Sequence, residues 1–173
     1  ALALATLLCF APGVAPAQGV STLATSLTAV RGIAGDPAGN LYCGLRTTGQ
    51  IVKFAAGTHA RTTFATSVGE VIGMVCGADG TLYCTDYNTD SYVWKITPGG
   101  VKSVLATVNR PAPLTIDAAG NLYVGEYFRM RILKITPAGD TSFVADVPGV
   151  NAADRLPALL METDGTLIAS TLT

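Results

Sequence analysis

Two short segments of this sequence place acidic, amide and basic side chains close together, each directly after an apolar run. They are Asp86-Tyr87-Asn88-Thr89-Asp90 and Glu126-Tyr127-Phe128-Arg129-Met130. Carboxylate, amide and guanidinium groups that converge on one face can hold a small ligand or a metal ion, and two carboxylates in different surroundings can act as acid and base. The candidate ligand-binding residues are Asp86, Asn88, Asp90, Glu126, Arg129 and Arg110.

A simpler interpretation of these carboxylates requires no ligand. Asp86 and Glu126 each follow a predicted strand, where a carboxylate can cap the strand end and pair with Arg129 or Arg131. The sequence favours this interpretation, because most buried polar groups are satisfied within the protein.

Other catalytic arrangements find little support. His59 is the only histidine, and it falls near a predicted turn at the opposite end of the strands from the two segments. A Ser/His/Asp or Cys/His relay requires a histidine within hydrogen-bond reach of its nucleophile. No CxxC or Cys/His spacing of the zinc-binding kind occurs. The sequence therefore predicts no catalytic residue and no metal ligand, and it leans away from an enzyme.

The N-terminal residues 1–17 differ from the rest of the chain. They begin with an apolar, uncharged run and end on Ala15-Pro16-Ala17, the small-x-small pattern of a signal-peptidase site. We interpret residues 1–17 as a signal peptide whose start lies outside this sequence, followed by a mature chain that is secreted or periplasmic. The apolar run is shorter than the roughly 20 residues of a membrane span, so we expect no such span in the mature chain.

Three of the four cysteines, Cys43, Cys76 and Cys84, remain after Cys9 leaves with the signal peptide. An odd number leaves at least one thiol free or paired between chains. Cys76 and Cys84 fall on adjacent predicted strands with a diagonal offset. Two alternatives stay open: a disulfide with second-rate geometry, or two buried thiols.

The composition is that of a β-rich protein with many tight turns. Of 173 residues, 49% are hydrophobic and only 13% are charged, with 19 Gly and 9 Pro. The formal net charge of −1 argues against nucleic acid as a partner, because phosphate binding requires clustered Lys and Arg.

The elements that would position the candidate site come from an internal repeat. Its copies begin at Gly39-Asn40-Leu41-Tyr42, Gly80-Thr81-Leu82-Tyr83, Gly120-Asn121-Leu122-Tyr123 and Gly165-Thr166-Leu167-Ile168, so that the glycines are 41, 40 and 45 residues apart. Self-similarity at this period indicates one supersecondary unit copied along the chain.

Each complete copy contains four short apolar segments separated by turns rich in Asp, Ala, Pro and Gly. The predicted strands are 32–35, 41–44, 50–54 and 62–65; 73–76, 82–85, 92–96 and 102–105; and 113–116, 122–125, 131–135 and 141–144. A lone predicted strand over 22–25 precedes the three complete copies. Two predicted strands follow them, the second of which covers 167–170. Four short strands linked by tight turns form one blade of a β-propeller. The predicted fold is therefore all-β, with about three complete four-stranded antiparallel blades and partial ones, and the side chains that recur once per blade pack between blades.

The blade pattern resembles the NHL repeat and the related six-bladed propellers of the gluconolactonase/senescence-marker-protein superfamily. The third copy carries most of the resemblance, in Leu114–Asp117, Gly120–Val124, Glu126, Arg131-Ile132, Lys134-Ile135 and Gly139. The resemblance covers residues 22–173, which hold fewer strands than a six-bladed ring requires. We therefore expect residues 18–173 to form a partial NHL-like ring that associates with itself, because its end blades expose apolar faces and strand edges.

The resemblance also implies a test for metal-dependent lactonase activity. The divalent ion of those enzymes lies on the central axis, at positions that correspond to Arg31, Ile72, Ala112 and Pro157. None of these residues offers the carboxylate or amide oxygen that calcium or magnesium prefers. The favoured expectation is an exported scaffold, without a cofactor, that binds a protein or carbohydrate ligand. The alternative is a fragment of a secreted gluconolactonase-like hydrolase, in which a divalent metal such as calcium would be held partly by other blades.

Overall fold

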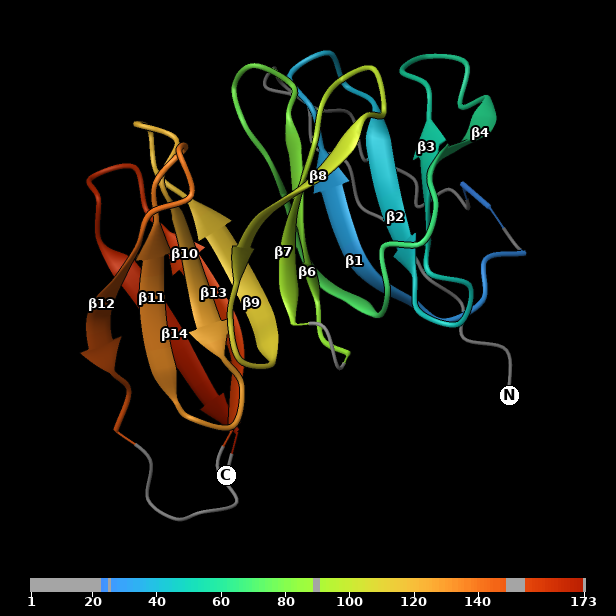
Figure 1. Cartoon of the computed structure of the whole chain (residues 1–173). Helices are drawn as coiled ribbons and strands as arrows, with labels where there is room; N and C mark the ends of the chain where they lie inside the picture. Colours follow the sequence, from blue (N-terminus) through green and yellow to red (C-terminus); the bar gives the residue numbers. More distant parts are fainter. Residues whose placement is uncertain (1–22, 25, 89–90, 149–154, 173) are drawn as a thin grey trace, which may run out of the picture.

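A computed structural model of the chain describes residues 23–24, 26–88, 91–148 and 155–172. This part of the chain contains 14 strands and no helix, so it has no helix that could cross a membrane. The strands form three four-stranded sheets and one two-stranded sheet, all antiparallel between neighbours. Figure 1 shows the first, second and third sheets in sequence order from right to left, and the fourth sheet overlaps the third in this view.

The three complete sheets share one meander topology, in which each strand pairs with the next in sequence. The first sheet contains β1 (Val30–Gly35), β2 (Leu41–Leu45), β3 (Gln50–Phe54) and β4 (Arg61–Ala65). The second contains β5 (Val71–Cys76), β6 (Leu82–Asp86), β7 (Tyr92–Ile96) and β8 (Lys102–Thr107). The third contains β9 (Pro111–Ile116), β10 (Leu122–Glu126), β11 (Arg131–Ile135) and β12 (Thr141–Asp146), and the fourth only β13 (Arg155–Met161) and β14 (Leu167–Leu172). Every predicted strand of the three complete copies is confirmed.

The turns between first and second strands explain why the repeat is marked by glycine. Gly120 has φ +82°, a conformation that costs glycine little and other residues more. Asp117 accepts hydrogen bonds from the backbone N–H of Asn121 at 2.8 Å and from its side-chain amide at 2.9 Å. Asp36 and Asn40 make the same pair of bonds, at 2.8 and 2.7 Å. The Asp-x-x-Gly-Asn sequence thus determines the turn.

The first strand of each sheet lies innermost, with β1 against β5, β5 against β9 and β9 against β13. One apolar cluster between the first and second sheets includes Tyr42, Ile51, Leu82 and Ile96, and its partly buried neighbours include Trp94. A second cluster, between the second and third sheets, includes Tyr83. The prediction that side chains recurring once per blade pack between blades is confirmed for Tyr42, Tyr83 and Trp94. It is wrong for Val52, which packs on the outer face of the first sheet.

The N-terminal end departs from the prediction of a lone strand over 22–25. Leu23 and Ala24, the described residues of that range, are not in a strand. Together with Leu27 they pack on the outer face of the first sheet, against a cluster that includes Cys43 and Phe54. The prediction is wrong for these residues, because their side chains cover an apolar sheet face instead of extending a sheet edge. Residues 1–17 lie outside the described part of the chain.

Candidate functional site

The ends of the sheets form two rims. The loop rim, at the bottom of Figure 1, carries the β2–β3, β6–β7 and β10–β11 loops and the connections between sheets. The turn rim, at the top, carries the β1–β2, β3–β4 and equivalent turns. Asp86 and Glu126 end β6 and β10 at the loop rim, whereas the exposed His59 lies in the β3–β4 turn. The histidine is therefore at the opposite rim, as the sequence predicts.

The two carboxylates are buried and engaged within the protein. Asp86 is 4% exposed, and one of its oxygens accepts hydrogen bonds from the backbone N–H groups of Glu70 and Asn88, both at 3.0 Å. Glu126 is 3% exposed and lies 3.3 Å from the Arg129 guanidinium and 4.0 Å from that of Arg131. This is the geometry that the strand-capping interpretation expects.

The other predicted site residues differ in their placement. Asn88, Arg110 and Arg129 are exposed at the loop rim. Asp90 lies outside the described residues. The structure thus brings Asp86, Asn88, Glu126, Arg129 and Arg110 to one rim without directing the two carboxylates at a common cavity.

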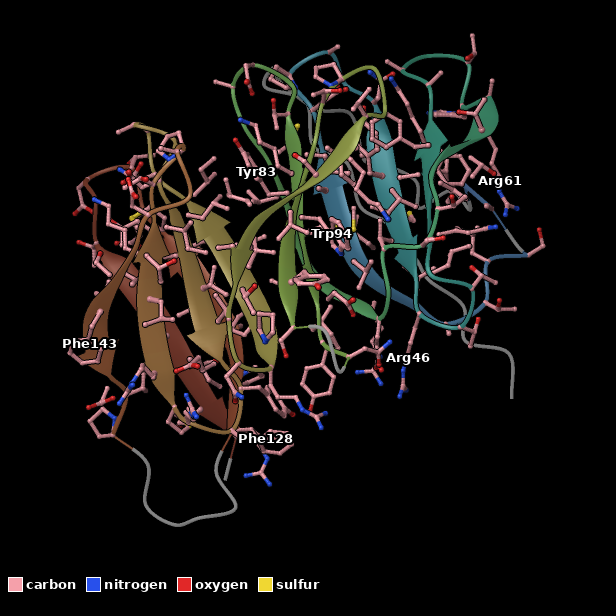
Figure 2. The ribbon with its side chains drawn as sticks, viewed as in Figure 1. Arg46, Arg61, Tyr83, Trp94, Phe128 and Phe143 are labelled. Carbon is pink, nitrogen blue, oxygen red and sulfur yellow. The ribbon has the colours of Figure 1, made fainter. Side chains whose placement is uncertain are left out.

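Aromatic rings, which the sequence analysis did not propose as site residues, occupy the exposed surface between these groups. Tyr87 and Tyr127 directly follow the two carboxylates, and their ring centroids lie 5.6 Å apart at 87°. Phe128 lies 5.2 Å from Tyr127 and 6.3 Å from Tyr87. The Arg110 guanidinium lies 5.3 Å from the Tyr87 centroid, and that of Arg155 lies 4.4 Å from the Phe128 centroid. We call these five residues the arginine–aromatic patch; Figure 2 shows Phe128 on its rim.

Backbone hydrogen bonds fix the patch to the sheets. The Tyr87 N–H donates to the Glu70 carbonyl at 3.0 Å, and the Tyr127 N–H donates to the Arg110 carbonyl at 3.1 Å. Each bond ties a loop to the start of the innermost strand of the same sheet. Arg110 itself has φ +46°, a left-handed conformation that is costly for a non-glycine residue. The signal in the sequence was the equivalent position of the two tyrosines in successive repeats.

Most of the remaining arginines at the loop rim are engaged in ion pairs. Arg46 pairs with Glu70, and Arg131 lies 3.3 Å from Asp146 as well as near Glu126. Within the described chain the exposed Arg110 guanidinium lies beside the Tyr87 and Phe128 rings and forms no ion pair, while the Arg110 backbone N–H donates to the Ser91 hydroxyl at 3.3 Å. A guanidinium stacked on an aromatic ring keeps its N–H edge free to bind a carboxylate.

The positions that the resemblance marked for a metal ion do gather at the axis. Arg31, Ile72, Ala112 and Pro157 all line an open pocket of about 230 Å³ between the innermost strands. None of the four has a carboxylate or amide side chain. Within the described ranges, no group of three or more His, Cys, Asp or Glu side chains is arranged to hold a metal ion.

The described cysteines are free thiols in the structure. The register places Cys84 opposite Met74 and Cys76 opposite Leu82, which is the predicted diagonal offset. Burial raises the pKa of the Cys76 thiol to about 11, with a further increase from the Asp36 and Asp79 carboxylates. Burial also raises the pKa of Cys84.

The fold is that of a β-propeller, and the chain resembles solved propeller structures. Virginiamycin B lyase from Staphylococcus aureus superposes with a TM-score of 0.70 at 19% identity, covering 83% of this chain and 49% of the lyase. A streptogramin B lyase gives a TM-score of 0.71 at 16% identity over 83% of this chain and 48% of that one. A chain of a nidogen/laminin complex gives 0.71 at 21% identity over 84% and 57%.

These likenesses show the fold alone, because every identity is below 25%. The chain spans about half the length of the propeller chains that it matches. No protein-family model matches the chain, and no curated protein is similar to it at a significant level.

Proposed function

We propose that this chain is a binding propeller that recognises a protein partner through the arginine–aromatic patch. The observation that carries the proposal is Phe128, which is 47% exposed while its ring lies between neighbouring tyrosines and beneath the Arg155 guanidinium. Tyrosine, other aromatic residues and arginine dominate the energetics of protein–protein interfaces. Backbone hydrogen bonds hold Tyr87 and Tyr127 to the sheets, so less ordering entropy opposes association at these two residues.

The partner that fits this surface has an apolar group for Phe128 and a carboxylate for Arg110. The neighbouring structures include enzymes, the lyases, and a nidogen in complex with laminin. Because one fold supports both functions, the choice rests on this chain's own residues. Asp86 accepts backbone hydrogen bonds and Glu126 pairs with Arg129, so neither carboxylate is free for catalysis, and this favours a binding function.

Selection from a displayed random-peptide library tests the proposal with a defined probe. We expect selected peptides to contain Asp or Glu next to an apolar residue, and to lose about tenfold or more in affinity against Phe128→Ala or Arg110→Ala. The matched control is Phe143→Ala, because Phe143 is 58% exposed on β12 and also lies beneath an arginine, at 5.4 Å from Arg131. Peptides whose affinity is unchanged by both patch variants would refute the proposal.

Two further parts of the proposal concern the export of the chain and the propeller family to which its blades belong. We propose that residues 1–17 direct export, supported by their apolar run and small-x-small end. We also propose that the blades belong with the NHL and gluconolactonase-like propellers, supported by the blade pattern of the third copy. Export predicts a mature N-terminus at Gln18 in the secreted protein, measurable by mass spectrometry.

The alternative function is a gluconolactonase-like hydrolase. It predicts calcium-dependent hydrolysis of gluconolactone by a longer protein in which further blades complete the ring and supply the metal ligands. Activity that survives purification and disappears with a chelator would favour the hydrolase over the binding scaffold.

A further inference from the structure

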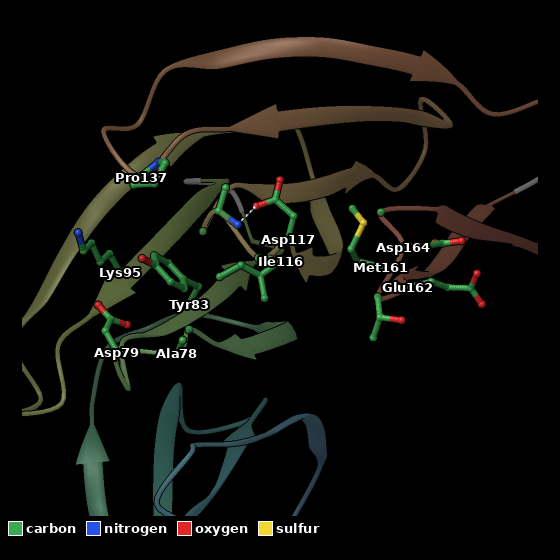
Figure 3. A pocket seen from close by; sticks show the side chains of 16 residues that line it. Ala78, Asp79, Tyr83, Lys95, Ile116, Asp117, Pro137, Met161, Glu162 and Asp164 are labelled. Atoms are coloured by element: carbon green, nitrogen blue, oxygen red, sulfur yellow. Dashed lines mark hydrogen bonds between the residues drawn. The ribbon is translucent and has the colours of Figure 1, made fainter.

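A second surface feature lies at the opposite end of the sheets from the arginine–aromatic patch. The turns of the second, third and fourth sheets enclose an open cleft of about 900 Å³ at the turn rim (Figure 3). We call it the turn-rim cleft. Its lining includes Tyr83, Lys95, Ile116, Asp117 and Met161.

Each complete sheet has a tyrosine at the same position of its second strand. The hydroxyl of this tyrosine donates a hydrogen bond to an aspartate in the first and third sheets but not in the second sheet. The Tyr42 hydroxyl donates to Asp36 at 3.0 Å, and the Tyr123 hydroxyl donates to Asp117 at 3.3 Å. The second sheet has Gly77 where the other two have this aspartate. Within the described residues no protein group bonds to the Tyr83 hydroxyl. The residue as a whole is 6% exposed, but the hydroxyl oxygen itself is open to the cleft.

The nearby aspartate of this turn does not replace the absent partner. Asp79 accepts hydrogen bonds from the Thr81 N–H at 2.9 Å and from the Thr81 hydroxyl at 2.8 Å. The Tyr83 hydroxyl is therefore free to donate a hydrogen bond into the cleft. Because Tyr83 lines the cleft, whatever occupies the cleft can supply the acceptor that an aspartate supplies in the first and third sheets.

The charges of the cleft restrict the chemistry of that acceptor. Asp79, Asp117, Glu162 and Asp164 line it, against the single ammonium of Lys95. Lys95 is the direct cross-strand neighbour of Tyr83, and in Figure 3 it lies on the same side of the cleft as Tyr83 and Asp79. A carboxylate or phosphate would be repelled by this excess of negative charge. A neutral hydroxyl oxygen can accept from Tyr83 while its own hydrogen is donated to a carboxylate.

We propose that the turn-rim cleft binds an uncharged polyhydroxylated ligand, a saccharide, one hydroxyl of which accepts the hydrogen bond of Tyr83. The Ile116 and Met161 side chains offer an apolar surface for the C–H groups of the sugar ring. The volume is within the range of small-molecule sites. This site is separate from the arginine–aromatic patch, so its test is independent of the proposed function.

Two variants isolate the Tyr83 hydroxyl. Tyr83→Phe removes only the oxygen. The triple change Gly77→Asp, Asp79→Ala, Thr81→Asn gives the second sheet the Asp-Ala-Ala-Gly-Asn turn of residues 117–121. Asp79 must be changed with Gly77, because a Cβ at Gly77 would lie 2.9 Å from the Asp79 carboxylate. The control is Tyr123→Phe, in which the lost hydroxyl was already bonded to Asp117.

The probes are maltose, cellobiose and N,N′-diacetylchitobiose, with glucuronate as the anionic comparison, each followed by saturation-transfer NMR and calorimetry. We expect at least one neutral disaccharide to bind with a Kd below about 10 mM, and Tyr83→Phe to weaken it about two- to tenfold. The grafted turn should abolish binding, whereas Tyr123→Phe should leave it unchanged.

Stability gives a second readout that does not depend on choosing the correct sugar. Without ligand, the grafted turn should raise Tm because Tyr83 gains an acceptor, and Tyr123→Phe should lower Tm because a bond is lost. The proposal is overturned if no neutral disaccharide binds, if glucuronate binds equally well, or if binding is unchanged in Tyr83→Phe and in the grafted turn.

Discussion

Asp86 is a candidate site residue by sequence, but in the structure its carboxylate stabilises the loop rim by accepting backbone hydrogen bonds. Removing the carboxylate by Asp86→Ala leaves the N–H groups of Glu70 and Asn88 without their acceptor. We expect this variant to lose about 1–3 kcal/mol of unfolding free energy, the cost of unsatisfied buried donors. Asp86→Asn keeps one oxygen acceptor and should lose less. Urea unfolding followed by circular dichroism measures both.

The neighbouring Gly69 provides an independent check on the same contact. It has φ +73°, and a Cβ there would meet the Asp86 carboxylate at 2.1 Å. Gly69→Ala should therefore be as destabilising as Asp86→Ala. Equal stability of Asp86→Ala and wild type would mean that the carboxylate serves a ligand and not the fold.

The thiols are the second group whose chemistry depends on burial. Because burial raises the pKa of Cys76 to about 11, only a very small fraction is thiolate near pH 8, and thiolate is the reactive form. Cys43 and Cys84 are buried. We expect a disulfide-exchange reagent to label Cys76 slowly in the native protein, faster as pH rises, and to label Cys43 and Cys84 only after unfolding.

Peptide mass spectrometry after labelling in denaturant distinguishes the two alternatives left open by the sequence. Free thiols label at all three positions without reductant. Labelling of Cys76 and Cys84 only after reduction would instead reveal the disulfide.

At the scale of elements, the innermost strands approach too closely for side chains at some positions. A Cβ at Gly73 in β5 would lie 2.3 Å from the Ala112 carbonyl of β9. The buried Thr85 hydroxyl joins the same strands, since it donates to the Ala112 carbonyl at 3.0 Å and accepts from the Gly73 N–H at 2.8 Å. These contacts fix the spacing of the second and third sheets.

Gly73→Ala should therefore destabilise the protein strongly, by about 1–3 kcal/mol or more from overpacking. Gly35→Ala is the matched control in β1, because a Cβ there would have only ordinary contacts, at 3.7 Å or more. Thermal unfolding compares the two variants. Equal Tm values would show that the two sheets can separate without cost.

At the scale of the whole molecule, local patterns predicted the sheets, and tertiary contacts determined the rest. The glycine-marked turns and the apolar segments between them identified every strand of the complete repeats, although only the first and third copies have the full Asp-x-x-Gly-Asn sequence. Counting back from the glycine found the axial position of Ile72. The short apolar pattern of Leu23 could not separate a strand from a segment that covers a sheet face. The arginine–aromatic patch depends on which side chains the loops carry. The positive φ of Arg110 recurs at Ala29 in the first repeat, but the aromatic rings and the arginine do not recur there.

The fourth sheet leaves the largest unpartnered surface of the described chain. Ile168 has the repeat position of Tyr42 and Tyr83, whose side chains pack against the next sheet. No described sheet follows, and Ile168 is 44% exposed, with Leu160 at 56% and Leu172 at 58%. Within the described residues β14 also has only one neighbouring strand. A face of this kind favours association.

The covered face of the first sheet determines the form of that association. Leu23, Ala24 and Leu27 cover part of the outer face of the first sheet, which disfavours head-to-tail stacking of the described chain, so we expect the fourth sheets of two copies to pair with each other. A two-fold axis between two β14 strands would create a four-stranded antiparallel sheet with the strand count of the other blades. We expect a discrete dimer with a closed, isologous interface, and not a filament.

Sedimentation velocity across the micromolar range measures this assembly. Ile168→Lys, which places a charge in the exposed face, should shift the chain to monomer. Val101→Lys is the control, because Val101 is 69% exposed but lies between β7 and β8, away from the fourth sheet. A wild-type monomer at every concentration would contradict the prediction, and open-ended growth would mean that residues 23–27 do not protect the first sheet.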